Sequence, residues 1–71
     1  MRNEPVMERR FEQEGRSYLV QVYHLGGRFV ATTRFDDVDV IEVDGPSQEE
    51  ALSRFYRWLP LAIQTRDLWR P

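Results

Sequence analysis

Residues 43–60, VDGPSQEEALSRFYRWLP, combine a Gly-Pro corner, a serine, two glutamates and an apolar periodicity. Ser47 and Glu50 have the spacing of a capping box, in which each side chain accepts a hydrogen bond from the backbone N–H of the other. Glu49 and Glu50 also lie where the helix dipole favours negative charge. The stretch therefore predicts a helix that begins at Ser47, and residues 47–63 are its expected span.

The side of this helix that faces the core is predicted from apolar residues at helical spacing. They are Leu52, Phe55, Leu59 and Ala62. Glu50 and Arg54 are four residues apart and favour a weak ion pair on the exposed side. Pro60 has no backbone N–H, so we expect it to kink or end the helix. Residues 64–71 are then expected to form a C-terminal tail.

Upstream of this helix, the sequence predicts antiparallel strands over residues 6–43, after an end expected to fray at residues 1–5. Gly26-Gly27 indicates a two-residue hairpin turn that pairs Leu25 with Arg28 and Tyr23 with Val30. A second turn is expected at Glu14-Gly15. The core side of the predicted hairpin carries Tyr18, Val20, Val22, Phe29, Ala31 and Phe35. The opposite side carries Leu19, Gln21, Tyr23, Val30, Thr32 and Arg34, is half apolar, and is expected to meet a partner.

These elements predict an α+β fold in one domain, residues 1–71: a three- to four-stranded antiparallel β-meander with one main helix packed on one face. A chain of 71 residues buries only about 60% of its unfolded surface, and its core rarely supplies more than about 3–5 kcal/mol. The chain has no cysteine, so disulfides cannot reinforce it. Association with itself or with another protein is therefore expected.

Composition excludes several classes of protein. The chain is 41% hydrophobic and 31% charged, which is typical of a globular protein rather than a disordered one. No apolar run approaches the roughly 20 residues of a membrane span, and the N-terminus lacks the apolar core of a signal peptide. These features predict a cytoplasmic protein. The net charge of −2 argues against a protein that binds nucleic acid through bulk charge.

The residues that usually carry catalysis are scarce. His24 is the one histidine and there is no cysteine, so neither a catalytic triad nor a His-rich metal site can be built. Ser17 is expected to point to the opposite side of its strand from His24. The sequence predicts no enzyme activity, no cofactor and no metal.

Two groups of residues are candidates for contact with a protein partner. The charged group is Asp36, Asp37, Asp39 and Glu42, because an acidic strand favours a basic partner. The apolar group is Tyr23, Trp58, Leu61 and Trp69, because aromatic residues are enriched at interfaces. An alternative surface for nucleic acid consists of Arg54, Arg57, Arg66 and Arg70, where arginine alternates with aromatic residues.

The segments YLVQVYHLGGRFVATTRF (residues 18–35) and VDGPSQEEALSRF (residues 43–55) resemble the HicB-like antitoxin domain, with a likeness that covers roughly residues 17–63. The matching residues are Phe29, Ala31, Gly45, Ser47, Glu49, Glu50, Ala51 and Leu52. The resemblance implies a β-β-β-α domain without the DNA-binding segment of many members. It also implies a non-catalytic antitoxin that covers a small basic ribonuclease toxin. The expected partners are that toxin and, because of the small core, a second copy of the chain. A nucleic-acid-binding regulator and a stand-alone homodimeric domain remain alternatives.

Overall fold

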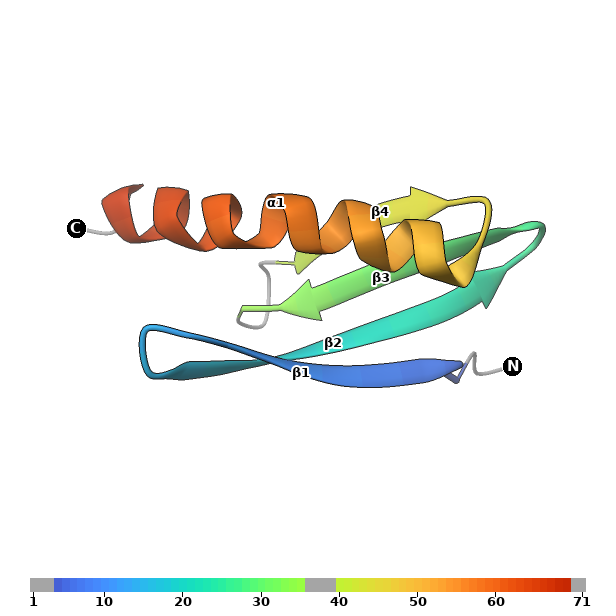
Figure 1. The fold of residues 1–71 in the computed structure, drawn as a ribbon, viewed down its shortest axis with the longest axis horizontal. Helices are drawn as coiled ribbons and strands as arrows, with labels where there is room; N and C mark the ends of the chain where they lie inside the picture. The colour runs from blue at the N-terminus through green and yellow to red at the C-terminus, as the bar shows by residue number, and fades with distance from the viewer. Residues whose placement is uncertain (1–3, 36–39, 70–71) are drawn as a thin grey trace.

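A computed structural model of the chain describes residues 4–35 and 40–69, with side chains over residues 4–35 and 40–65. The strands are β1 (Met7–Gln13), β2 (Arg16–Leu25), β3 (Arg28–Arg34) and β4 (Val40–Gly45), and they are followed by the helix α1 (Gln48–Trp69). The strands form one antiparallel sheet in the order β1-β2-β3-β4, with α1 on one face (Figure 1). The predicted α+β meander with a packed helix is confirmed.

Two tight turns set the register of the first three strands. Glu14 and Gly15 both have positive φ angles, 52° and 77°, as a type I′ turn requires. Gly26 has a φ of 63°, which only glycine adopts at little cost. The paired residues include Leu25 with Arg28 and Tyr23 with Val30, so the predicted hairpin register is confirmed.

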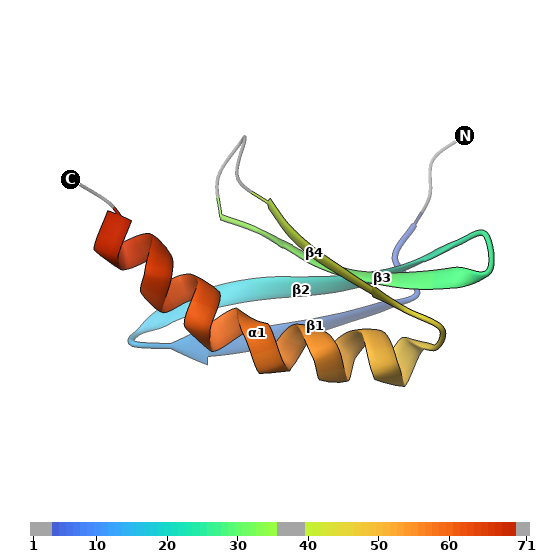
Figure 2. The same cartoon turned by 90° about the horizontal axis from the view of Figure 1, so that it is seen from above.

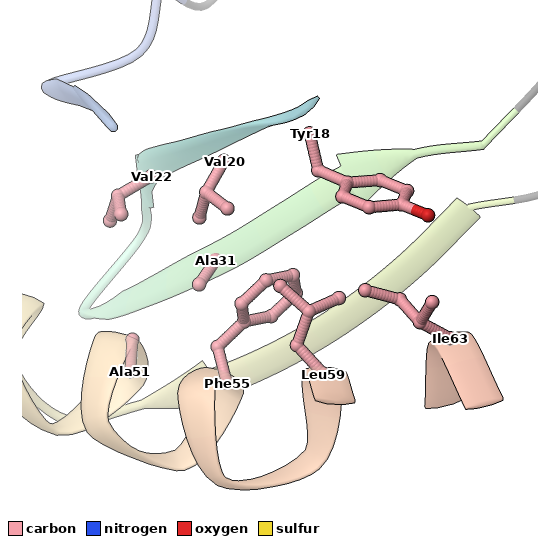
Figure 3. Packing of buried hydrophobic residues seen from close by; sticks show 8 residues of the cluster. All are labelled: Tyr18, Val20, Val22, Ala31, Ala51, Phe55, Leu59 and Ile63. Atoms are coloured by element: carbon pink, nitrogen blue, oxygen red, sulfur yellow. The ribbon is translucent and has the colours of Figure 1, made fainter. Parts of the chain in front are cut away.

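The core lies between α1 and the inner face of the sheet, and the outer face has no described element over it (Figure 2). Figure 3 shows the eight buried apolar side chains: Tyr18, Val20, Val22, Ala31, Ala51, Phe55, Leu59 and Ile63. Phe29 and Phe35, also predicted on this side, are partly buried against the cluster. Thr33 is buried among them, and its hydroxyl donates a hydrogen bond to the Leu19 carbonyl at 2.7 Å.

The helix begins as the sequence predicts, but its buried side differs in two positions. The Glu50 N–H donates to Ser47 Oγ at 3.1 Å, which is the N-cap bond. Ala51 and Ile63 are buried with Phe55 and Leu59, whereas the predicted Leu52 and Ala62 are only half-buried. The buried residues therefore follow a spacing of four, which is the ridge that helices commonly present when they pack.

The predicted end of the helix at residue 63 is wrong, because α1 continues through Pro60 to Trp69. Pro60 is exposed, so its ring points away from the sheet, and the missing N–H removes a single hydrogen bond from the helix. The helix bends between its two halves (Figure 2), which is the common consequence of an internal proline. The Pro60 carbonyl accepts a hydrogen bond from Gln13 Nε2 of β1 at 3.4 Å.

Candidate functional site: the β4 edge and the outer face of the sheet

β4 is an edge strand, since it pairs with β3 alone among the described strands. The two-residue turn at Gly26-Gly27 makes Leu25 and Arg28 a hydrogen-bonded pair, and such pairs alternate along an antiparallel ladder. The pairing register of β2, β3 and β4 then directs the N–H and C=O groups of Val40, Glu42 and Asp44 away from β3. A row of backbone donors and acceptors therefore lines the open side of β4.

The end of β4 nearest the helix is held by arginines. Arg54 Nη1 donates to the Asp44 carbonyl at 3.1 Å, and Arg54 Nη2 lies 3.6 Å from the Glu50 carboxylate. Arg28 Nε donates to Asp44 Oδ2 at 2.7 Å. The hydrogen bond and the charge of Arg28 hold the pKa of Asp44 below its ordinary value, and the charge of Arg54 adds a smaller effect in the same direction. Glu42, further along β4, has no ion-pair partner within the described residues.

Arg54, Trp58 and Leu61 are spaced at four and three residues, so they form one continuous ridge on α1. We call these three residues the helix ridge. Because Arg54 contacts β4, the helix ridge lies on the side of α1 that faces the open edge. Trp58 and Leu61 are 56% and 53% exposed. These two large apolar side chains are therefore exposed to solvent close to β4. Along the helix axis they lie within about two turns, or roughly 11 Å, of Arg54.

The opposite side of α1 is occupied by contacts within the chain. Tyr56 stacks on Phe11 of β1, with ring centroids 5.9 Å apart. Leu52 packs against the core cluster. The two sides of the helix thus differ, because one is covered by the sheet and the other carries the exposed helix ridge.

The outer face of the sheet is a second exposed apolar surface. Among the described side chains, three of the six large apolar residues that are clearly exposed belong to it, namely Leu19, Leu25 and Val40. An open hollow of about 430 Å³ also lies on this side of the sheet. Its lining consists of Gln21, Tyr23, Thr32, Thr33, Arg34, Val40 and Glu42.

The predicted partner residues are divided between these surfaces. Trp58 and Leu61 lie on the helix ridge, whereas the side chain of Glu42 projects from the outer face of β4. Tyr23 projects from the outer face of the sheet, so it does not form one surface with Trp58 and Leu61. Asp36, Asp37 and Asp39 lie outside the described residues, as does the side chain of Trp69.

The arginines of the nucleic-acid alternative do not form a described cluster. Arg54 is engaged by the Asp44 carbonyl and by Glu50. Arg57 is exposed on α1, whereas Arg70 and the side chain of Arg66 lie outside the described residues. Binding of nucleic acid through these residues stays a prediction.

His24 and the acidic side chains are the described groups of the kind that most often bind metal ions. His24 is exposed and its ring stacks on Phe29, with centroids 4.4 Å apart and planes at 4°. Over residues 4–35 and 40–69 there is no group of three or more His, Cys, Asp or Glu residues that could hold a metal ion. Within the same residues, no helix has both the length and the apolar character that crossing a membrane requires.

No protein-family model, curated protein or solved structure matches this chain. The predicted resemblance to the HicB-like domain therefore rests on the sequence segments that suggested it.

Sequence reasoning did not single out Val6, Leu25 or Val40 as exposed apolar residues. Val6 and Val40 lie where the alternation of apolar and polar residues is poor, so the sequence did not assign them to a face. The available signal was the pairing register, which places every second residue of a strand on the same face once one turn is known.

Proposed function

We propose that this chain is a non-catalytic protein-interaction module, similar to a HicB-type antitoxin, that binds a basic protein along its β4 edge. The observation that carries the proposal is the open side of β4 beside the helix ridge, where Trp58 and Leu61 are exposed. The proposed occupant is an extended segment of the partner, with a lysine or arginine opposite Glu42.

Each part of this surface has a role in such binding. An extended segment that adds to an exposed strand gains main-chain hydrogen bonds, while neighbouring side chains provide specificity. The free backbone groups of Val40 and Glu42 are available for those bonds, whereas the Asp44 carbonyl is already taken by Arg54. Trp58 supplies the large aromatic side chain that most often dominates interface energetics.

Charge favours a basic partner at this edge. Glu42 is exposed and unpaired within the described residues, so an incoming arginine or lysine would not have to displace an internal partner. A hydrogen bond to an ionised group contributes about 1.5–3 kcal/mol. A basic toxin of the kind that the HicB resemblance implies has the required charge.

The test is co-purification of the tagged chain from its own host, followed by measurement of the dissociation constant with the purified partner. Glu42→Arg reverses the charge on β4, and Trp58→Ser removes the aromatic anchor. Glu12→Arg makes the same charge change on β1, the edge strand on the other side of the sheet, and is the matched control.

We expect a basic protein at a fixed ratio with the original chain and with Glu12→Arg. Glu42→Arg should weaken its binding by at least about tenfold, which corresponds to about 1.4 kcal/mol, and Trp58→Ser should weaken it by a similar factor or more. A partner that binds Glu42→Arg and Trp58→Ser as tightly as the original chain would contradict the proposed edge. A chain that purifies without a protein partner would contradict the proposed function itself.

A further inference from the structure

We infer that a second copy of this chain docks against the outer face of the sheet, so that two sheets pack face to face with their helices outside. The two proposals share Val40 and Glu42 of β4. The inference is nevertheless tested separately, because its test changes Glu8 and Arg10 of β1, the edge strand opposite β4. It also assigns the predicted self-association to Tyr23 and its neighbours rather than to Trp58.

The outer face carries apolar groups that no described element covers. Leu19 is 49% exposed and Val40 is 40% exposed, on β2 and β4 respectively. Tyr23 and Val30 pair with each other on the two central strands and are only half-buried. A sheet that has apolar groups on both faces is most stable when both faces are covered.

Two neighbouring rows of residues at the middle of the outer face carry charges of opposite sign, whereas Glu12 and the ion pair of Arg28 and Asp44 lie outside these rows. The first row runs across all four strands through Glu8, Gln21, Thr32 and Glu42, which are successive partners in the register. The second row is displaced from the first by two residues on every strand. It consists of Arg10, Leu19, Arg34 and Val40. The rows are about 7 Å apart, because each strand residue spans about 3.4 Å.

This arrangement is complementary to itself under one two-fold rotation. An axis that runs across the strands, midway between the two rows, places the acidic row of one copy over the basic row of the other. Glu8 then faces Arg10 of the second copy, and this opposite-charge pair forms twice because of the symmetry. On the other strands Gln21 faces Leu19, Thr32 faces Arg34 and Glu42 faces Val40. A two-fold axis along the strands would instead place Glu8 over Glu42, which like charge disfavours.

The charged residues of these rows are available for such pairing. Within the described part of the chain, the side chains of Arg10, Arg34 and Glu42 make no hydrogen bond or ion pair, and the Glu8 carboxylate accepts one hydrogen bond from Gln21 Nε2 at 2.7 Å. Opposite charges that pair across an interface fix its register and disfavour other orientations.

The size of the face is that of a weak dimer, because its flat area lies just below that of a stable specific interface. Four strands at a spacing of about 4.8 Å and seven residues at about 3.3 Å give a face of about 19 by 23 Å. Two such faces have a combined flat area on the order of 900 Å², before the relief of the side chains is counted, and a specific interface needs about 1,000 Å². We therefore expect a dissociation constant in the micromolar range.

The test uses charge reversal at Glu8 and Arg10, with mass measured by sedimentation equilibrium. The original chain should reach twice its 8.5 kDa mass as concentration rises through the micromolar range. Glu8→Arg alone and Arg10→Glu alone each create like-charge pairs across the axis, and each should raise the dissociation constant at least tenfold. Combining both changes in one chain, or mixing the two single variants, restores opposite pairs and should restore the dimer.

The controls separate this surface from others and from loss of the fold. Restoration on mixing shows that each single variant is folded, and circular dichroism of each variant checks this directly. Trp58→Ser lies on the helix ridge and should leave the dissociation constant unchanged. Three results would overturn the inference: a monomer at every concentration tested, single variants that dimerise like the original chain, or a dimer abolished by Trp58→Ser.

Discussion

Replacing Gly45 with alanine tests how the end of β4 is joined to the helix. A Cβ at this position would lie 2.8 Å from the Ala51 backbone nitrogen, 3.1 Å from the Ala51 Cα and 3.2 Å from the Glu50 carbonyl carbon. Non-bonded heavy atoms are most stable at about 3.5–4.0 Å, so the closest of these contacts is too short by roughly 0.7 Å. All three neighbours are backbone atoms of the first helical turns and cannot rotate away.

The expected cost follows from that overlap. Relief requires the start of α1 to move away from β4, which would loosen Ala51 and Phe55 in the core, where both are 0% exposed. Adding a methyl group to a tightly packed site costs about 1–3 kcal/mol. The whole fold of a chain this small is worth about 3–5 kcal/mol, so Gly45→Ala should remove roughly half of it. At about 4–8 °C per kcal/mol, Tm should fall by roughly 10 °C or more.

Gly27→Ala is the matched control, since a Cβ at Gly27 would have no heavy atom within 4 Å. Thermal and urea unfolding, followed by circular dichroism, give the free energy of unfolding of both variants. We expect Gly27→Ala to lie within about 0.5 kcal/mol of the original chain, as is usual for surface substitutions. If Gly45→Ala changes the free energy of unfolding as little as Gly27→Ala does, the close approach of β4 and α1 does not constrain this fold.

Three further changes test the helix and its contacts with the sheet. Ser47→Ala removes the N-cap and should lower the free energy of unfolding by about 1 kcal/mol, measured by urea unfolding; no loss would show that the 3.1 Å bond contributes little. Pro60→Ala should raise the free energy of unfolding, because an interior proline costs about 3 kcal/mol, and a lower Tm would instead show that the bend is needed for packing. Arg28→Gln should raise the pKa of Asp44 in an NMR titration. The folded-state pKa of Asp44 lies below its ordinary value of 3.8, so the pair stabilises the fold above that pH, and the effect is lost as pH falls through the folded-state pKa. An unchanged pKa would contradict the assigned cause.

The hairpin could be predicted from the sequence because local rules determine it. A two-residue glycine turn fixes which residues pair, and the period of two then assigns every side chain of β2 and β3 to a face. Tyr18, Val20, Val22 and Ala31 were placed in the core by that rule alone, and they are buried.

The end of the helix could not be predicted in this way. Pro60 is a strong local signal for a break, but Ile63 beyond it is 2% exposed and packs in the core. Burying an isoleucine side chain contributes about 1.5–3 kcal/mol, comparable with the cost of the proline. Long-range packing therefore offsets the local preference, and no local pattern reports it.

The buried side of the helix shows the same limit. Helical spacing favoured Leu52 as a core residue, whereas Ala51 is the one that is buried. Gly45 has no side chain, so β4 can approach the helix backbone closely at Ala51. The open side of β4 could not be predicted from local patterns either, because it depends on the order of the strands in the sheet.

The central claim, that β4 is the strand that receives the partner, is tested most directly by amide hydrogen exchange. Exchange at each residue is measured by NMR for the free chain and for its complex with the co-purified protein. We expect the outward-facing N–H groups of Val40 and Glu42 to exchange quickly in the free chain and to be strongly protected in the complex. Protection confined to β1, with Val40 and Glu42 still exchanging quickly, would contradict it.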